Sequence, residues 1–471
     1  MEQVNISSIF TIIQLLQSLW VAFIVIMLFY RFRIGLAAYL AYIFLVPYMK
    51  IYIGSFLLQW NFINILVLIA FFIHRQTTYS QRIKYDWRPI LPFIVYFGGI
   101  LLLMLFQDGV PFSYAINAWR KQVLKCLILA FVIWNDVTVS HESLKLYRKV
   151  TIVCIIIMTL YGLFLTTMPG VNPYMMIVSA VNGESFNMAY AAGYSAMADD
   201  GSLVDDMSTG DSLEFHNDYQ LEESRLFGRI SSVFSHPMTF GLFLGLSILY
   251  LYRNRNNISR PLLYLISLII MADIIVCGVR SVIAAMLIVT SFLLLYLRKL
   301  KLFFILTVIS CILWITITNI PELYNYIGSI FDDSNSHVSG SSWGMRLSQL
   351  KGCFIEIQNT ILAGKGYGWT GYYLSQNGAH PTMLHFESLF FVVLCNSGIL
   401  GLTLWLVMGS MIVKNNNKLI RTNTALLHSL FVFYVAYACI TGDYGYMQYY
   451  IVFYILMLGE DIYLQRGKCI S

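Results

Sequence analysis

Long apolar runs, separated by short polar stretches, dominate the pattern of hydrophobic and polar positions along the chain. A helix that crosses a membrane needs about 20 mostly apolar residues in succession. The pattern therefore predicts an all-α, polytopic membrane protein with 12–13 transmembrane helices, the lower number allowing for one short run and for one run that begins with basic residues. The predicted spans are 8–30, 34–49, 52–74, 90–106, 119–137, 150–168, 235–252, 261–278, 281–297, 301–318, 385–413, 423–441 and 445–463.

Two longer polar stretches interrupt the apolar runs and divide the chain into five segments. These are N-terminal spans over 1–168, an acidic loop over 169–229, central spans over 230–318, a second loop over 319–384 and C-terminal spans over 385–471. Within the second loop, between Met345 and Leu362, apolar residues recur at helical spacing. This predicts an amphipathic helix on the membrane surface, with an apolar face of Leu350, Phe354, Ile357 and Ile361 and with Arg346, Gln349, Lys351 and Glu356 mostly elsewhere.

Composition supports the membrane class. The chain is 58% hydrophobic and 11% charged, with a mean hydropathy of +0.69, whereas about a quarter of the residues in a soluble domain are charged. No basic stretch precedes the first run, so no cleavable signal peptide is expected. Most of the eight cysteines lie in apolar runs, where we interpret them as small hydrophobic residues and not as a disulfide framework or a metal site.

The basic residues predict an orientation. If the N-terminus lies outside, every basic cluster between the spans faces the cytoplasm, except Arg120, Lys121 and Lys125. The C-terminus is then cytoplasmic and both long loops are outside. The first of these loops carries ten acidic residues and is expected to be solvated and partly disordered.

This orientation leaves three arginines on the outer side: Arg229, Arg280 and Arg346. A charge at membrane depth is costly, so such residues are candidates for function. Three converging guanidinium groups would bind a diphosphate through charge-assisted hydrogen bonds. The alternative is that each side chain extends to the outer lipid headgroups. Asp273 lies two helical turns before Arg280 and is expected to be a structural counter-ion.

Polar residues also stand at the predicted mouth of the span that begins near 385: His380, His385 and Glu387. A carboxylate or imidazole there could act as a general base if burial raises its pKa towards neutrality. The alternative is ordinary interfacial polarity. His236 precedes Pro237, which is typical of a helix start.

A glycine-rich segment matches the letters of a dinucleotide-binding motif. Gly366, Gly368 and Gly371 spell G-x-G-x-x-G, but no strand or βαβ unit is predicted around them. We interpret this segment as a flexible turn with aromatic residues at the interface, and we expect no cofactor or metal.

Four segments, taken in order, resemble the O-antigen ligase and polymerase superfamily of bacterial membrane glycosyltransferases. Arg229 to Gly241 is similar to the family's Arg-x-x-Gly-x-Phe-x-x-Pro helix start, with Ser232 in place of the usual glycine. The other three are Gly278 to Ala284, the Gly-x-Arg helix and Gly-x-Gly turn of Gly344 to Gly368, and His385 to Leu402.

The resemblance implies transfer of a glycan from undecaprenyl diphosphate to an acceptor hydroxyl, on the outer face of the bacterial cytoplasmic (inner) membrane and without metal or nucleotide sugar. It implies that Arg229, Arg280 and Arg346 bind the diphosphate and that Glu387, or else His385, is the base, with Arg280 counted among the catalytic groups. Ligases of the family tend to carry histidine where this chain has Glu387. This difference favours a polymerase of O-antigen, capsular or exopolysaccharide repeat units.

Two other functions are alternatives at this point. One is an O-antigen ligase that transfers the lipid-linked glycan to lipid A core or protein, and the other is a transporter of the same glycan. A transporter typically shows repeated halves and polar residues along a midplane pathway, neither of which is evident here. The expected partners are the undecaprenyl-diphosphate-linked oligosaccharide, the lipid bilayer and a polysaccharide chain-length regulator, with no nucleic acid.

Overall fold

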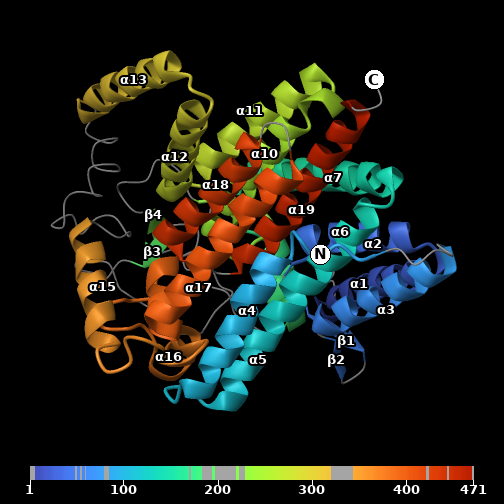
Figure 1. The fold of residues 1–471 in the computed structure, drawn as a ribbon, viewed down its shortest axis with the longest axis horizontal. Helices are drawn as coiled ribbons and strands as arrows, with labels where there is room; N and C mark the ends of the chain where they lie inside the picture. The colour runs from blue at the N-terminus through green and yellow to red at the C-terminus, as the bar shows by residue number, and fades with distance from the viewer. Residues whose placement is uncertain are drawn as a thin grey trace. The chain divides into compact units, whose positions relative to one another are not determined.

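The computed structural model describes residues 6–47, 50–53, 56–58, 60–78, 84–168, 171–182, 194–196, 219–221, 229–319, 343–420, 424–442 and 445–468. These residues are almost entirely helical (Figure 1), as the sequence predicts. Two short antiparallel ribbons accompany the helices: β1 (Ile51–Ile53) with β2 (Phe56–Leu58), and β3 (Tyr194–Ala196) with β4 (Tyr219–Leu221). The ten acidic residues of the first predicted loop lie outside the described residues, so the prediction about them stays open.

The chain divides into two compact units, each built from separate stretches of sequence. The first unit comprises Met1–Tyr85, Ile128–Leu221 and Phe227–Val279. In it, α2 packs against α1 and α7, and α11 packs against α7 and α10. Its helices are α1 (Ile6–Tyr30), α2 (Phe32–Leu45), α3 (Trp60–Thr78), α6 (Leu129–Val137), α7 (His141–Leu165), α8 (Pro173–Asn182), α10 (Pro237–Arg253), the 3-10 turn η3 (Arg255–Asn257) and α11 (Arg260–Val276).

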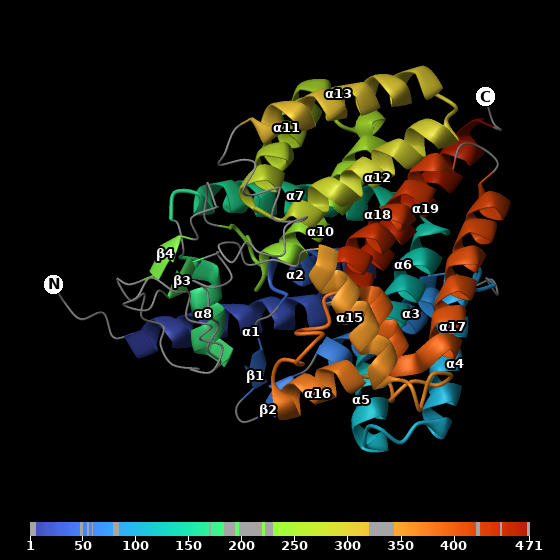
Figure 2. The same cartoon turned by 90° about the vertical axis from the view of Figure 1, so that its left-hand side faces the viewer.

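The second unit comprises Asp86–Leu127, Glu222–Leu226 and Arg280–Ser471. In it, α17 packs against α4, α12 against α18, and α15 and α16 against α17 (Figures 1 and 2). Its elements are α4 (Leu91–Leu103), the 3-10 turn η1 (Met104–Phe106), α5 (Phe112–Val123), α12 (Arg280–Tyr296), α13 (Leu300–Thr318), α15 (Trp343–Glu356), α16 (Trp369–Asn377), α17 (Leu389–Leu419), α18 (Ala425–Thr441) and α19 (Tyr446–Lys468). A π-helical turn, Leu124–Ile128, follows α5 in the chain.

The core of the second unit surrounds α19, which is buried on nearly every side from Tyr446 to Leu458. Tyr450 stacks on Tyr434 of α18 with ring centroids 4.7 Å apart. A helix that is apolar all round belongs in an interior, so the position of α19 agrees with its composition.

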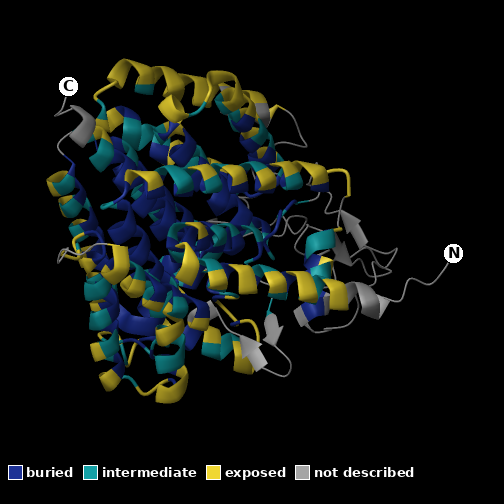
Figure 3. Ribbon diagram, turned by 90° about the vertical axis from the view of Figure 1, so that its right-hand side faces the viewer, coloured by how far each residue is buried: buried dark blue, intermediate teal, exposed yellow. Residues whose placement is uncertain are grey.

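Several helices expose apolar side chains. Along α13, nearly every described side chain is exposed, including Phe304, Ile309 and Ile312 (Figure 3). Large exposed apolar surfaces are typical of protein or membrane contact. Among the described residues, three helices are long and apolar enough to cross a membrane: Thr11–Tyr30, His141–Leu165 and Leu389–Leu419. Six shorter apolar helices accompany them: Phe32–Leu45, Phe62–Thr78, Leu91–Phe106, Arg280–Tyr296, Leu300–Ile312 and Ala425–Thr441.

Some predicted boundaries are wrong. The run 52–74 is not one helix, because its first part forms β1 and β2 and α3 begins only at Trp60. The triplets of β1 and β2 flank Gly54-Ser55, a pair that favours turns over helix. The predicted span 385–413 begins at Leu389 and continues to Leu419, since the residues before it fold into turns. The hydropathy pattern of the sequence alone does not predict such turns.

Candidate functional site

A break in α17 organises the site. Gly398 has φ 62° and ψ −160°, a conformation that only glycine adopts without strain, and it divides α17 into two helical segments. Backbone groups on both sides of the break bond to residues 361–366. The N–H groups of Ile399 and Leu400 donate to the carbonyl oxygens of Ile361 and Leu362, each at a distance of 3.0 Å. The carbonyl oxygens of Cys395 and Asn396 accept from the backbone N–H groups of Lys365 and Gly366, at distances of 2.8 and 3.1 Å.

The glycines of 364–368 allow this close approach. An added Cβ at Gly364 would lie 2.5 Å from the backbone nitrogen of Ser397, and one at Gly398 would lie 2.4 Å from the carbonyl oxygen of Leu362. Gly364, Gly366 and Gly368 all have positive φ. The predicted turn is confirmed for 364–368 only, because Gly371 lies in α16 (Trp369–Asn377), and the close backbone contacts hold 364–368 against α17.

Gln107, which follows η1, completes this arrangement. Its Nε2 donates to the carbonyl oxygens of Ala363 and Asn396, and its Oε1 accepts from the N–H of Tyr367. Asn396 in turn accepts through its side chain from the N–H of Thr370, at the start of α16. The polar atoms at the break are therefore satisfied within the protein, as an interior break in a helix requires.

Residues 380–388 form a series of tight turns before α17. His380 and Leu384 exchange two backbone hydrogen bonds of 2.9 Å. The N–H of Phe386 donates to the carbonyl oxygen of Met383, and the N–H of Ser388 donates to that of Phe386. Leu384 and Phe386 have φ values of 48° and 57°, which are unusual for residues with a side chain. Backbone strain of this kind clusters at functional sites. Here it flanks His385 and immediately precedes Glu387, two of the predicted catalytic residues.

Buried aromatic rings anchor these turns. Phe386 is 1% exposed and lies against Trp369 and His380, with ring centroids 5.6 and 5.5 Å apart. The neighbouring side chains, His385 and Glu387, are half-buried. With Phe386 fixed in the core, the two polar side chains on either side are held at the edge of the unit.

Glu387 is joined to Arg346. Nη2 of Arg346 lies 3.1 Å from Oε2 of Glu387, and Nη1 donates to the Glu387 carbonyl oxygen over 2.7 Å. The same guanidinium donates to Oε1 of Gln349 over 3.0 Å and to the carbonyl oxygen of Ile440, near the end of α18, over 2.9 Å. An arginine at a helix C-terminus satisfies carbonyls that have no partner within the helix. Arg346 thus connects α15, α18 and the turns that precede α17.

The end of α15 corrects the bounds of the predicted amphipathic helix, and its placement on a membrane surface stays a prediction. This helix ends at Glu356, not at 362; of the predicted apolar face, Ile357 is fully buried, whereas Phe354 and Ile361 are 44% and 40% exposed. The side that faces the protein carries Gln349 and Cys353, both fully buried, together with the half-buried Arg346. Hydrogen bonding within the unit, and not apolar burial alone, decides which side of α15 faces inward.

A second polar cluster lies at the end of α15. Nζ of Lys365 is 2.9 Å from Oε1 of Glu356, and Nε2 of His380 is 3.6 Å from Oε2. Burial tends to raise the pKa of Glu356, but the hydrogen bonds and charges of Lys365 and His380 outweigh it and hold that pKa below its usual range. Nδ1 of His380 accepts from the N–H groups of Thr382 and Met383, which leaves an Nε2–H to face Glu356.

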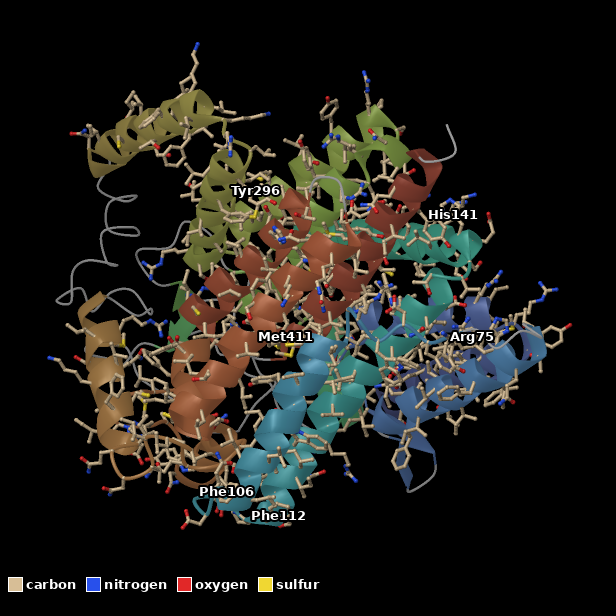
Figure 4. All side chains as sticks on the ribbon, viewed as in Figure 1. Arg75, Phe106, Phe112, His141, Tyr296 and Met411 are labelled. Atoms are coloured by element: carbon tan, nitrogen blue, oxygen red, sulfur yellow. The ribbon has the colours of Figure 1, made fainter. Side chains whose placement is uncertain are left out.

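Arg280 begins α12, directly after the turn at Gly278, which has φ 62°. At the other end of α12, the Tyr296 hydroxyl (labelled in Figure 4) lies 3.1 Å from Oγ1 of Thr424, just before α18 begins. Because the end of α12 meets the start of α18, the two helices run antiparallel. Arg280 therefore lies at the same end of this helix pair as Ile440 and the Arg346 guanidinium.

Arg229 lies in the first unit, whereas Arg280 and Arg346 lie in the second. Convergence of all three stays a prediction. Near Arg229, Ser232 has φ 51°, a backbone conformation that favours glycine. Its Oγ donates to the carbonyl oxygen of Met158 over 2.7 Å. The predicted helix start is confirmed, because Pro237 opens α10 and Nδ1 of His236 accepts from the Met238 N–H.

Sequence reasoning missed the contribution of Gln349, Glu356 and Lys365. One signal was available: polar or small side chains at 346, 349, 353 and 356 are spaced three, four and three residues apart, the period of one helical face. The contacts of Gln107 with 363–367 carry no such signal, since they join residues far apart in the chain.

No protein-family model matches this chain, and no curated protein matches it either.

Proposed function

We propose that the protein is a membrane glycosyltransferase that polymerises oligosaccharide repeat units carried on undecaprenyl diphosphate. The Arg346–Glu387 pair carries this proposal. Oε2 of Glu387 bonds to Arg346, and Oε1 has no hydrogen bond to any described residue. The side chain is 23% exposed, so the free oxygen has access to a hydroxyl group. A carboxylate held at one oxygen and open at the other is suited to act as a general base.

In this mechanism, Glu387 takes the proton from an acceptor hydroxyl as that oxygen attacks the anomeric carbon. The bond from the anomeric carbon to the diphosphate oxygen breaks, and the anomeric configuration inverts. Arg280, at the same end of the α12–α18 pair, stabilises the negative charge on the departing diphosphate. Arg229 is proposed to assist it, and His385 is the second candidate for the base.

Arg346 is given a more specific role. Four hydrogen bonds engage its guanidinium, two of them to Glu387. We therefore propose that Arg346 chiefly positions the base and that its contact with the diphosphate is secondary. This assignment separates Arg346 from Arg280, which the sequence alone placed in one group.

The membrane setting belongs to the same proposal. The three long apolar helices and the exposed apolar surfaces of α1 and α13 support insertion in a bilayer. We propose 12–13 spans in the bacterial cytoplasmic membrane, a cytoplasmic C-terminus and the site on the outer face. The break in α17 fits this setting, since its freed backbone groups bond to the protein.

The test is complementation of a polymerase-deficient host that carries the matching glycan genes, read as a glycan ladder on a gel. Wild type should restore the ladder, and Glu387→Gln and Arg280→Ala should give single repeat units at normal protein levels. Glu142→Gln is the matched control, because Glu142 is exposed and pairs only with Lys145 among the described residues. A ladder that survives Glu387→Gln would refute the proposed base. Long glycans stranded on the lipid carrier when the protein is deleted would indicate a ligase.

A further inference from the structure

Two cysteines from separate helices meet beside the proposed site. The Sγ atoms of Cys353 on α15 and Cys395 on α17 are 3.5 Å apart, and both residues are fully buried. They lie in one compact unit, 42 residues apart in the chain. The sequence predicted only small hydrophobic cysteines in apolar runs, and spacing in the chain gave no reason to pair these two.

Neighbouring contacts hold the two thiols together. The Cys395 carbonyl accepts from the N–H of Lys365, which fixes the backbone at the break in α17. On α15, an added Cβ at Gly352 would lie 2.5 Å from Oγ1 of Thr382, so α15 lies close against the turns before α17. To reach the S–S bond length of about 2.05 Å, the sulfur atoms must move together by about 1.5 Å from their separation of 3.5 Å.

We propose that Cys353 and Cys395 form a disulfide bond in the mature protein. The bond would link α15, which carries Arg346, to the helix that follows Glu387. Both thiols lose a proton, and the two electrons pass to a disulfide-bearing thiol oxidant, which is reduced to its dithiol form. This inference rests on the outward placement of 319–384 proposed above, since disulfides persist in oxidising compartments and are rare in the cytosol.

The chemistry of exchange also suits this pair. A second thiol held in contact attacks a mixed disulfide as an intramolecular reaction, which is much faster than attack by a thiol from solution. The oxidant would act during folding, before α15 covers Cys395. The alternative is that both cysteines remain reduced and fill space as small apolar side chains.

The test counts thiols in full-length protein from aerobically grown cells. Membranes are denatured with a maleimide present and no reductant, then digested and analysed by mass spectrometry. Of the eight cysteines, two would be in the bond, so six should be alkylated. A peptide that joins Cys353 to Cys395, lighter by two hydrogen atoms and lost after reduction, should accompany them. It should be absent in Cys353→Ser and retained in Cys154→Ser, whose buried cysteine lies in the other unit.

Alkylation of all eight cysteines in the wild type would overturn the proposal, as would a linked peptide that forms only after copper phenanthroline is added. The thiol count requires no glycan substrate, so its result tests the disulfide independently of the glycan ladder, which tests the proposed polymerase activity. To test the orientation, Gln376→Cys is made in the Cys353→Ser background and labelled in cells with a membrane-impermeant maleimide. Residue 376 is exposed, so labelling above that of the Cys353→Ser variant alone supports the outward placement, and labelling no greater than that variant's overturns it.

Discussion

Two acidic side chains, Glu387 in the second unit and Asp273 in the first, lie in contrasting surroundings. Glu387 is partly exposed and bonds to Arg346. Asp273 on α11 is fully buried, and neither of its carboxylate oxygens has a hydrogen bond to a described residue. Its neighbours include the ring of Phe240 on α10 and the backbone of Gly162 on α7. Of the two, only Glu387 combines a positioning partner with access for a substrate.

The comparison shows that sequence position does not distinguish the two acids. Both stand at one end of an apolar run, Glu387 at its start and Asp273 near its last residue, and both lie close in sequence to a polar or basic residue. Asp273 was expected to be a structural counter-ion, and neither of its buried carboxylate oxygens has a hydrogen bond to a described residue of its unit.

The largest expected effect is structural and contrasts a glycine from each region. In Gly398→Ala, the new Cβ collides with the backbone of Leu362, and residue 398 must also keep a positive φ. Because both obstacles are backbone, no side-chain movement relieves them. We expect a loss of ~3 kcal/mol or more and little folded protein. In Gly162→Ala, the nearest atom is Cζ of Phe240 at 2.7 Å, the end of a side chain, and the loss should be smaller.

Yield and thermal stability in detergent, followed by size-exclusion chromatography, measure both variants. Gly371→Ala is the control, because its nearest heavy atom would be the Tyr114 hydroxyl at 3.5 Å, an ordinary contact. Folded Gly398→Ala protein with wild-type stability would show that the break in α17 does not depend on glycine.

The next effect concerns the two acids themselves. Glu387→Gln keeps the shape of the side chain and removes the base, so turnover of lipid-linked repeat units should fall by about 10²–10⁴-fold. Asp273→Asn should leave turnover near that of the wild type, since no described residue loses a hydrogen bond. Turnover by purified protein is the measurement. Equal losses in both variants would remove the distinction between the two regions.

Arg346→Lys tests whether the arginine positions the base. Lysine keeps the charge but lacks the planar fork that reaches Glu387, Gln349 and Ile440 together. A displaced base should lower kcat by up to about 10²-fold, with KM little changed. A raised KM at unchanged kcat would instead assign Arg346 to substrate binding.

The smallest effect concerns the cluster at the end of α15. The folded-state pKa of Glu356 lies below its usual 4.5, so the charged form adds stability above that pH, and this stability is lost as pH falls through the folded-state value. Glu356→Gln should lower stability at pH 7 by under about 1 kcal/mol, as expected for a partly exposed pair. Thermal unfolding at pH 7 and at acidic pH should show the difference from wild type narrowing on acidification. A difference that stays constant with pH would exclude the ionised pair as its cause.

Much of the helical framework follows from the sequence. Runs such as 261–278 and 281–297 appear as α11 and α12 with shifts of one or two residues, because apolar length and the His236-Pro237 type of start are local properties. The run at 52–74 shows where this fails. β-Branched and aromatic residues are equally apolar in a strand and in a helix, and only the pairing of β1 with β2 distinguishes them.

By itself, the sequence determined the helical class and most helix positions, and it proposed Arg346, His385 and Glu387 as candidate site residues. Only the tertiary structure decided that Arg346 binds Glu387, that α15 turns Gln349 inward, and that Cys353 meets Cys395. The physical reason is the range of the interactions. Apolar length and capping act between neighbours in the chain, whereas these contacts join residues about 40 apart and depend on the backbone geometry at Gly364 and Gly398.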